Sequence, residues 1–88
     1  MSYRVVWENE CFRQLDVLLG AGASSKQLSY TVEAIADELS VVPHRKGTPL
    51  SEGLFRFEFP PLRAYFPIDE GAGLVRIDTI WWIGDAGT

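Results

Sequence analysis

Cysteine and histidine are almost absent from this chain of 88 residues. Cys11 is the single cysteine and His44 the single histidine. No internal disulfide can form, and the ligands from which most transition-metal sites are built are too few. We predict no metal and no cofactor, and we interpret Cys11 as a small buried hydrophobe rather than a nucleophile. His44, with no second imidazole beside it, is a poor candidate for catalysis.

Long apolar runs are missing as well. No stretch approaches the roughly 18 to 20 apolar residues that a membrane helix needs. The N-terminal residues do not form a basic region followed by an apolar core and a small-residue cleavage site. We expect a cytoplasmic protein with no membrane partner.

Positive charge is scarce. Eight Lys and Arg residues against twelve Asp and Glu residues give a net charge of -4, with a pI near 4.8. Such a protein has no general attraction to phosphate, so any nucleic-acid site must be a local patch that works against the overall charge. The only basic cluster is His44-Arg45-Lys46, which is either a solvated loop or a patch that faces phosphate.

Apolar residues, by contrast, are plentiful. They make up 47% of the chain and include three Trp, five Phe and three Tyr. A chain of this length buries about 60 to 65% of its unfolded surface, which suffices for one modest core. We predict a single domain over residues 1–88, with a disordered tail at about 84–88.

Three runs in the last third of the chain alternate apolar and polar residues, which is typical of β-strands. The alternating sets are Phe55, Phe57 and Phe59; Leu62, Ala64, Phe66 and Ile68; and Val75, Ile77, Thr79 and Trp81. Pro60-Pro61 and the loop 69–73 separate these runs. The run from Tyr3 to Trp7 is predicted to be a fourth strand of the same sheet.

Two amphipathic helices are predicted between the first strand and the other three. The first has Asn9 as N-cap and ends before the turn 20–25; its apolar stripe is Phe12, Leu15, Leu18 and Leu19. The second runs from about Ser25 to Ser40 with Leu28, Val32, Ile35, Ala36 and Leu39 at helical spacing. A loop follows over residues 43–52. This order predicts an α+β fold: a two-helix hairpin packed on one face of a mostly antiparallel four-stranded sheet.

The opposite face of that sheet is predicted to be open. Alternation places on it Arg56, Glu58, Arg63, Tyr65, Arg76 and Asp78. The face is either a solvated surface with ion pairs worth about 0.2 to 1 kcal/mol each, or a binding surface. If Trp81 points into the core, Trp82 points away from it, where it either anchors a partner or packs on the core or tail.

Four stretches together resemble the RelE/ParE superfamily of small toxins from bacterial toxin–antitoxin systems. They are Tyr3-Arg4-Val5-Val6-Trp7 with its helix; Ala34-Ile35 with Leu39, Pro43 and Gly47; Leu54-Phe55-Arg56-Phe57; and Leu62-Arg63-Ala64-Tyr65 leading to Ile68-Asp69 and the last strand. The resemblance spans residues 3–82 and depends on the order and spacing of these short stretches. It implies the RelE/ParE-like fold, a role in plasmid stabilisation, and a cognate antitoxin that wraps the helices and covers the open face.

The resemblance implies one of two toxin mechanisms. In a ribosome-dependent mRNA interferase, Arg63 would stabilise the scissile phosphate and Tyr65 would stack on a base or donate a proton. Arg56 and Arg76 would assist, with Arg45 and Lys46 gripping the RNA or ribosome. A toxin that poisons DNA gyrase would need none of these nuclease residues.

The sequence departs from the ribonuclease members of the family near its C-terminus. Where they place another basic residue and then a tyrosine, this chain has Trp81-Trp82-Ile83-Gly84-Asp85, and Leu54 stands where a lysine is often found. Each missing donor removes about 2.7 to 4 kcal/mol of transition-state stabilisation. Enzyme activity is therefore left open, and a catalytically inactive RelE/ParE-like binding module is the alternative. A homodimer and a hetero-oligomer with the antitoxin are both compatible with the sequence.

Overall fold

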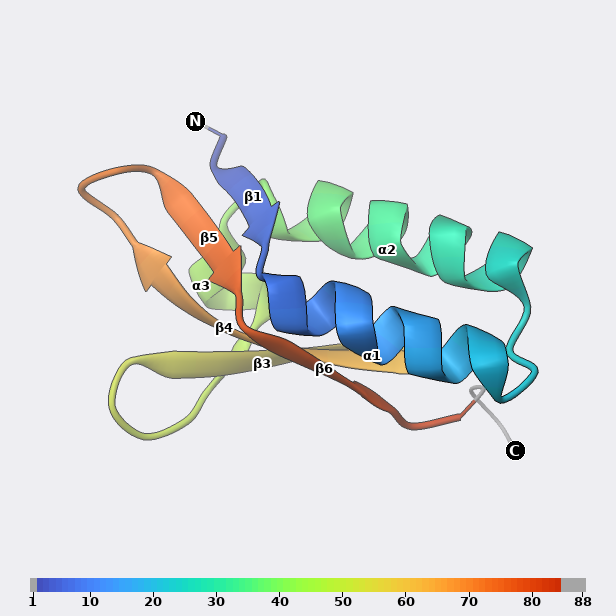
Figure 1. Ribbon diagram of the computed structural model, residues 1–88. Helices are drawn as coiled ribbons and strands as arrows, with labels where there is room; N and C mark the ends of the chain where they lie inside the picture. The colour runs from blue at the N-terminus through green and yellow to red at the C-terminus, as the bar shows by residue number, and fades with distance from the viewer. Residues whose placement is uncertain (1, 85–88) are drawn as a thin grey trace.

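The predicted α+β fold is confirmed by the computed structural model, which describes residues 2–84 (Figure 1). The elements are, in chain order, β1 (Arg4–Trp7), α1 (Asn9–Gly20), α2 (Ser25–Leu39), α3 (Pro43–Lys46), β2 (Thr48–Pro49), β3 (Leu54–Phe59), β4 (Leu62–Asp69), β5 (Leu74–Ile77) and β6 (Thr79–Trp82). The tail predicted at about 84–88 lies, from residue 85 on, outside the described residues. No helix in the described part of the chain is long and apolar enough to cross a membrane.

The sheet is built around β4. Its strand order is β1-β5-β4-β3-β2, and β6 continues from β5 along the same side of β4. All pairs are antiparallel except β1 with β5, which run parallel. The sheet thus has six strands instead of the predicted four, because the last run is divided into β5 and β6 and because Thr48–Pro49 adds a short edge strand.

The two long helices lie side by side over one face of the sheet (Figure 1). Ser24 caps α2 by accepting a hydrogen bond from the Gln27 N–H at 3.1 Å. The N-cap of α1 is Glu8, not the predicted Asn9, and it has no side-chain cap. The chain enters α1 directly from β1, and the Glu8 N–H donates to the Ile77 carbonyl oxygen at 3.0 Å. A backbone bond to the sheet therefore fixes where α1 begins.

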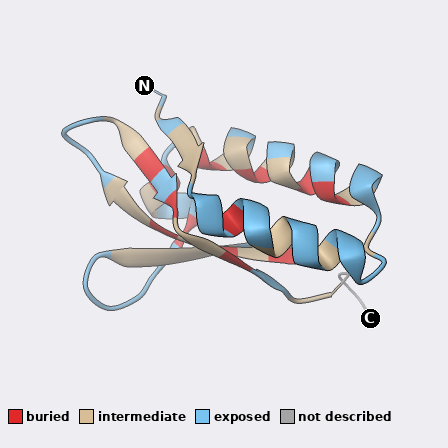
Figure 2. Ribbon diagram, in the orientation of Figure 1, coloured by how far each residue is buried: buried red, intermediate tan, exposed pale blue. Residues whose placement is uncertain are grey.

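The core lies between the helix pair and the sheet (Figure 2). Its fully buried members are Ile35 and Leu39 from α2, Leu62, Ala64 and Phe66 from β4, and Val75 and Ile77 from β5. Each large apolar side chain buried here contributes about 1.5 to 3 kcal/mol. The predicted stripe of α1 is partly wrong, because Phe12 and Leu19 are exposed while Cys11 is buried with Leu15 and Leu18 packed against the core. The inward side of α1 is therefore rotated by about one residue from the predicted stripe.

The segment predicted to be a loop over residues 43–52 contains regular structure. Pro43 occupies the first position of the short helix α3, where its missing N–H costs nothing. Thr48 and Pro49 then pair with Arg56 and Phe55 of β3. Pairing with β3 gives part of this segment a regular strand structure that its turn-forming residues do not predict.

A one-residue shift in strand register divides β5 from β6. Ile68 pairs with Val75, and a continuous register would pair Tyr65 with Asp78. Tyr65 instead pairs with Thr79, while the Asp78 N–H donates to the Tyr65 carbonyl oxygen at 2.9 Å. Asp78 is thus the extra residue of a β-bulge, which reverses the faces of all side chains that follow it.

The bulge corrects the predicted orientation of the last strand. Ile80 pairs with Ala64 and is only 3% exposed, whereas Trp81 pairs with Arg63 and is 59% exposed. Trp81 therefore lies on the open face, and Trp82, expected on that face, lies on the side of α1. Strict alternation from Val75 onward gave the opposite assignment because it assumed an unbroken strand.

Candidate functional site

Two rows of side chains cross the open face of the sheet. Residues that pair directly across antiparallel strands project to the same side, so Glu58 on β3, Arg63 on β4 and Trp81 on β6 form one row. Arg56 on β3 and Tyr65 on β4 belong to the next row. The prediction that Arg56 and Arg63 share one face with Tyr65 is confirmed by this register. We call these five residues the open-face cluster.

Arg63 is the best-held side chain of the cluster. Its Nε donates to Glu58 Oε2 at 2.6 Å, and its Nη2 contacts the same carboxylate oxygen. Its Nη1 lies 3.4 Å from the Tyr65 hydroxyl oxygen. The hydrogen bonds that Arg63 donates to Tyr65 and Glu58 raise the pKa of its guanidinium above the usual value. The guanidinium therefore remains charged, but a neighbouring carboxylate already neutralises it.

Aromatic surface lies next to this guanidinium. The rings of Tyr65 and Trp81 meet edge to face, with centroids 6.3 Å apart. The Trp81 ring is more than half exposed, so it offers a flat apolar surface beside a charge pair. Such surfaces suit a stacked base or an apolar side chain of a partner.

Arg56 is the free cation of the cluster. It lies beside Tyr65, and no residue in the range 2–84 forms an ion pair with it. A negatively charged ligand on the open face could therefore bind Arg56 without displacing a carboxylate, whereas binding to Arg63 would require displacement of Glu58.

Arg76 lies apart from the cluster. On β5 it stands about four residues along β4 from Arg63, which is roughly 13 Å of strand. Its Nε lies 2.9 Å from Asp78 Oδ1 and 3.4 Å from Glu8 Oε1. The hydrogen bond to Asp78 raises the pKa of Arg76. Alternation along the strands allowed an ion pair of Arg76 with either Glu58 or Asp78, and the structure contains the one with Asp78.

The basic triplet does not form a single patch. His44 contacts Glu70 and packs edge to face on Tyr3 and Phe55. Lys46 contacts Glu38 of α2. Arg45 has no ion-pair partner among the described residues, and it is exposed. Two of the three side chains thus connect α3 to other parts of the fold.

Sequence reasoning missed Trp81 and the pairing of Glu58 with Arg63. Trp81 was assigned to the core, and one signal could have placed it correctly. The apolar positions Val75, Ile77 and Ile80 change from a spacing of two to a spacing of three across Asp78, and such a phase change is what a bulge produces. Alternation alone also allowed an ion pair of Arg63 with Asp78, but the two-residue break at Pro60-Pro61 was a signal that could have placed Glu58 opposite Arg63.

Comparisons with known proteins support the toxin fold. The chain is similar to the toxin chain in the crystal structure of the toxin–antitoxin complex RelBE2 from Mycobacterium tuberculosis, with 26% identity, a TM-score of 0.77, and coverage of 93% of this chain and 99% of that one. It also shares the fold of the conserved hypothetical protein HP0892 from Helicobacter pylori, with 18% identity, a TM-score of 0.60, and coverage of 91% and 93%. No family model matches the sequence, and no curated protein matches it.

The class of protein follows from the fold and the first of these matches. The helix hairpin on a sheet with an open face, matched over nearly the whole length of a toxin chain, is the architecture of a toxin from a toxin–antitoxin system. The resemblance to the RelE/ParE superfamily is thereby confirmed.

Proposed function

We propose that this chain is the toxin of a toxin–antitoxin pair and that it acts by binding a target protein, as a gyrase-poisoning toxin does, rather than by cleaving RNA. The match to the toxin chain of RelBE2 supports the first part. Because that chain was solved in complex with its antitoxin, we also propose a cognate antitoxin as the partner that covers the helices and the open face.

The proposal that the chain binds a protein depends on one observation: the guanidinium of Arg63 is already paired with the carboxylate of Glu58. In-line cleavage of RNA needs free donors around a phosphorane that carries two negative charges. Of the two cations in the open-face cluster, only Arg56 has no ion-pair partner among residues 2–84. Trp81 occupies the position next to Arg63 on β6. An exposed tryptophan beside a satisfied ion pair is better suited to contact a protein.

An mRNA interferase is the second candidate. The observation that favours it is the contact between the Tyr65 hydroxyl and Arg63, which would place a proton donor beside a phosphate-binding group if Glu58 moved away. A non-toxic binding module is the third candidate, and the net charge of -4 favours it.

Expression of the chain without a partner in a bacterial host tests these candidates. We expect growth arrest with intact bulk mRNA, as judged by primer extension on abundant transcripts. Trp81→Ala should relieve the arrest, while Lys26→Ala, which removes an exposed cation on α2, should not. Cleavage phased with codons and abolished by Arg63→Ala would establish the interferase instead, and an absence of arrest would establish the binding module.

The neighbouring open reading frame tests the partner. We expect a small frame beside this one that encodes a DNA-binding segment followed by a segment that binds this chain. Co-expression of that frame should restore growth, and the two chains should co-purify. Arrest that persists despite abundant co-expressed product would contradict the assignment of antitoxin.

A further inference from the structure

Three polar side chains lie in a row across the open face, one on each of the strands β2, β3 and β4. Thr48 on β2 pairs with Arg56 on β3, and Arg56 pairs with Tyr65 on β4. Residues that pair in this way project to the same side of a sheet, with Cβ atoms about 4.5 to 5.5 Å apart. One guanidinium side chain therefore lies between two side chains that carry hydroxyl groups. We call these three residues the Arg56 row.

Each side chain of the Arg56 row has donor hydrogens that no group accepts in the part of the chain that the structure describes. Arg56 makes no side-chain hydrogen bond and no ion pair with residues 2–84, and the Thr48 hydroxyl has no partner there. The Tyr65 hydroxyl oxygen accepts from Arg63 Nη1 at 3.4 Å, which leaves its own hydrogen available. The row thus offers one full positive charge and two neutral donors to an anionic oxygen group.

Charge restricts the ligand of this row to one isolated anionic group. The two guanidinium groups and the Glu58 carboxylate of the open-face cluster leave a single positive charge. The next cation along the sheet, Arg76, is roughly 13 Å of strand away and is paired with Asp78. A nucleic-acid strand would bring further phosphates against Glu58 and against the net charge of -4. A lone carboxylate on a partner protein meets no such repulsion.

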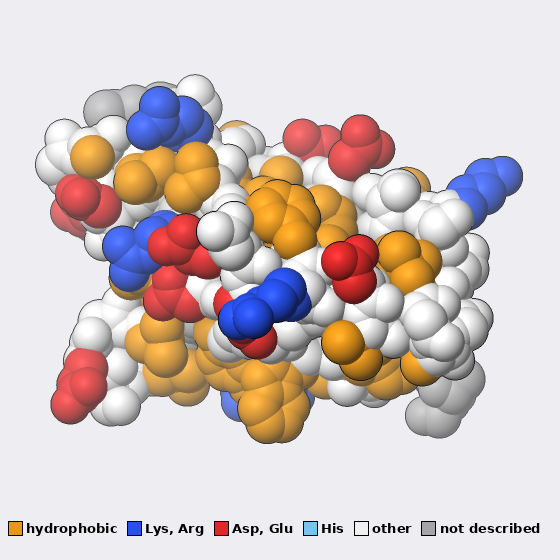
Figure 3. Space-filling view, in the orientation of Figure 1, with side chains coloured by type: hydrophobic (Ala, Val, Ile, Leu, Met, Phe, Trp, Pro, Cys, Tyr) orange, Lys and Arg blue, Asp and Glu red, His pale blue; other side chains and the backbone are white. Residues whose placement is uncertain are grey.

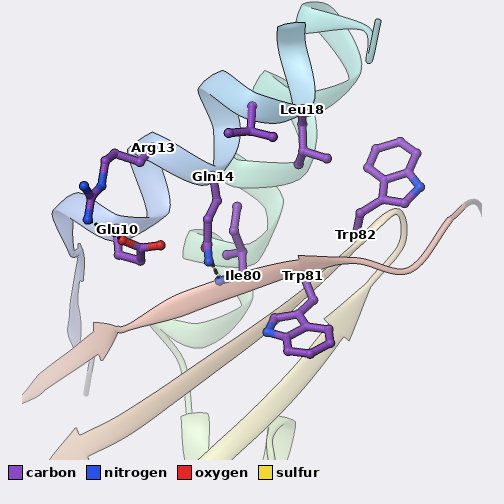
Figure 4. A pocket seen from close by; sticks show the side chains of 8 residues that line it. Glu10, Arg13, Gln14, Leu18, Ile80, Trp81 and Trp82 are labelled. Atoms are coloured by element: carbon purple, nitrogen blue, oxygen red, sulfur yellow. Dashed lines mark hydrogen bonds and ion pairs between the residues drawn. The ribbon is translucent and has the colours of Figure 1, made fainter. Parts of the chain in front are cut away.

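An exposed aromatic surface adjoins the row. The Trp81 ring is 59% exposed and meets the Tyr65 ring edge to face, with centroids 6.3 Å apart. Figure 4 shows that Trp81 and Trp82 leave β6 on opposite sides and that Trp81 points away from Gln14 of α1. Because Tyr65 contacts Trp81 and pairs with Arg56, a carboxylate bound by the row would carry its neighbouring side chain over the Trp81 ring.

The helix side of the molecule does not suit an anionic partner. Residues 8–40 carry six acids and two bases. The acids Asp16, Glu33 and Asp37 have no ion-pair partner among the described residues. Figure 3 shows acidic side chains distributed among hydrophobic ones on the side of the molecule that it presents. An acidic surface of a partner is therefore repelled by the helices and attracted to the open face.

We propose that the Arg56 row and Trp81 bind an aspartate or glutamate side chain that lies next to an aromatic side chain on the surface of the target protein. This inference rests on the proposed function, in which the chain acts by binding a protein. Arg56 pairs with the carboxylate, the hydroxyls of Thr48 and Tyr65 donate to its oxygens, and the aromatic side chain packs on Trp81. Glu58 remains in its own ion pair and repels any further anion.

Titration of the full chain with small ligands tests the site. The probe is acetyl-Asp-Phe-amide, followed by NMR shifts of the side-chain N–H groups of Arg56 and Trp81, and we expect a Kd of about 1 mM. Acetyl-Asn-Phe-amide has nearly the same shape without the charge and should bind about tenfold more weakly. Hexauridylate, a short RNA strand, should also bind more weakly than the acidic peptide at equal ionic strength.

Variants of the chain separate the row from net charge. Arg56→Gln should weaken binding of acetyl-Asp-Phe-amide about tenfold, and Thr48→Val and Tyr65→Phe, which each remove one hydroxyl, about threefold. Arg4→Gln changes the net charge equally at an exposed residue of β1 and should leave binding unchanged. Equal binding of the Asp and Asn peptides, or equal losses for Arg56→Gln and Arg4→Gln, would overturn the proposal. Tighter binding of hexauridylate would overturn it in favour of RNA.

Growth arrest distinguishes failure of this inference from failure of the function on which it rests. Where the unmodified chain arrests growth, Arg56→Gln should relieve the arrest and Arg4→Gln should not. Full arrest by Arg56→Gln would overturn the carboxylate site and leave the binding of a target protein intact. An absence of arrest by the unmodified chain would overturn the proposed function, and the peptide titration would then decide the carboxylate site.

Discussion

At the scale of single residues, the two side chains best suited to chemistry already donate hydrogen bonds to other groups of the protein. Arg63 donates to Glu58, and the Cys11 thiol donates to the Ile77 carbonyl oxygen at 3.3 Å. The sequence-based account left Arg63 either in an ion pair of the open face or as a phosphate ligand and did not name Glu58 as its partner, but it correctly placed Cys11 in the core. A residue type shows what a side chain can do, whereas its partner determines whether it is available.

Cys11 gives a prediction that depends on pH. Burial raises the pKa of its thiol from 9.0 to about 11, which lowers the thiolate fraction at pH 8 by about 100-fold. Iodoacetamide should therefore alkylate the native protein at least about 100-fold more slowly than the urea-unfolded protein, as followed by mass spectrometry. Because the folded-state pKa is raised, the contribution of this group to stability is complete below pH 9 and is lost between pH 9 and about 11. Equal rates for native and unfolded protein would contradict the burial of Cys11.

At the scale of elements, the β-bulge at Asp78 decides what the last strand presents to each side. It turns Ile80 into the core and Trp81 onto the open face. The pairing of β1 with β5 ends at Trp7 opposite Ile77, where the chain leaves the sheet and enters α1. The composition of the open-face cluster thus follows from the bulge.

Two alanine substitutions test the register of β6. Ile80→Ala should lower the free energy of unfolding by about 2 to 5 kcal/mol, because it leaves a cavity in the core. Trp81→Ala should cost no more than about 1.5 kcal/mol, the scale of its ring contact with Tyr65. Urea denaturation followed by circular dichroism measures both. A larger loss of unfolding free energy for Trp81→Ala than for Ile80→Ala would contradict the bulge and favour the unbroken strand that simple alternation predicts.

At the scale of the whole molecule, charge is divided between the two layers. Residues 8–40, which include the two long helices, carry six acids and two bases, and the remaining residues carry six of each. Two of the six acids in residues 8–40 pair with cations outside that range, Glu8 with Arg76 and Glu38 with Lys46. Glu58 is the one acid of the open-face cluster and it pairs with Arg63. The affinity of this cluster for a polyanion should therefore depend on that carboxylate more than on net charge.

Heparin chromatography distinguishes local from overall charge. Glu58→Gln and Glu33→Gln change the net charge equally, but only the first frees Arg63, since Glu33 is exposed on α2 without an ion-pair partner among the described residues. We expect Glu58→Gln to elute from heparin at a higher salt concentration than Glu33→Gln, which should behave like the unmodified chain. Identical elution of the two variants would show that net charge alone governs binding to the polyanion.

The sequence alone determined the order of the long elements, the helix pair, and the shared face of Arg56, Arg63 and Tyr65, because helical and strand periodicities are local and survive in any context that buries one side. Tertiary structure decided what depends on how the strands pair: the bulge at Asp78 and the short strand β2. A single extra residue in one strand is nearly invisible along the chain, yet it reverses every side chain after it. The face on which Trp81 lies was therefore fixed only when β6 met β4.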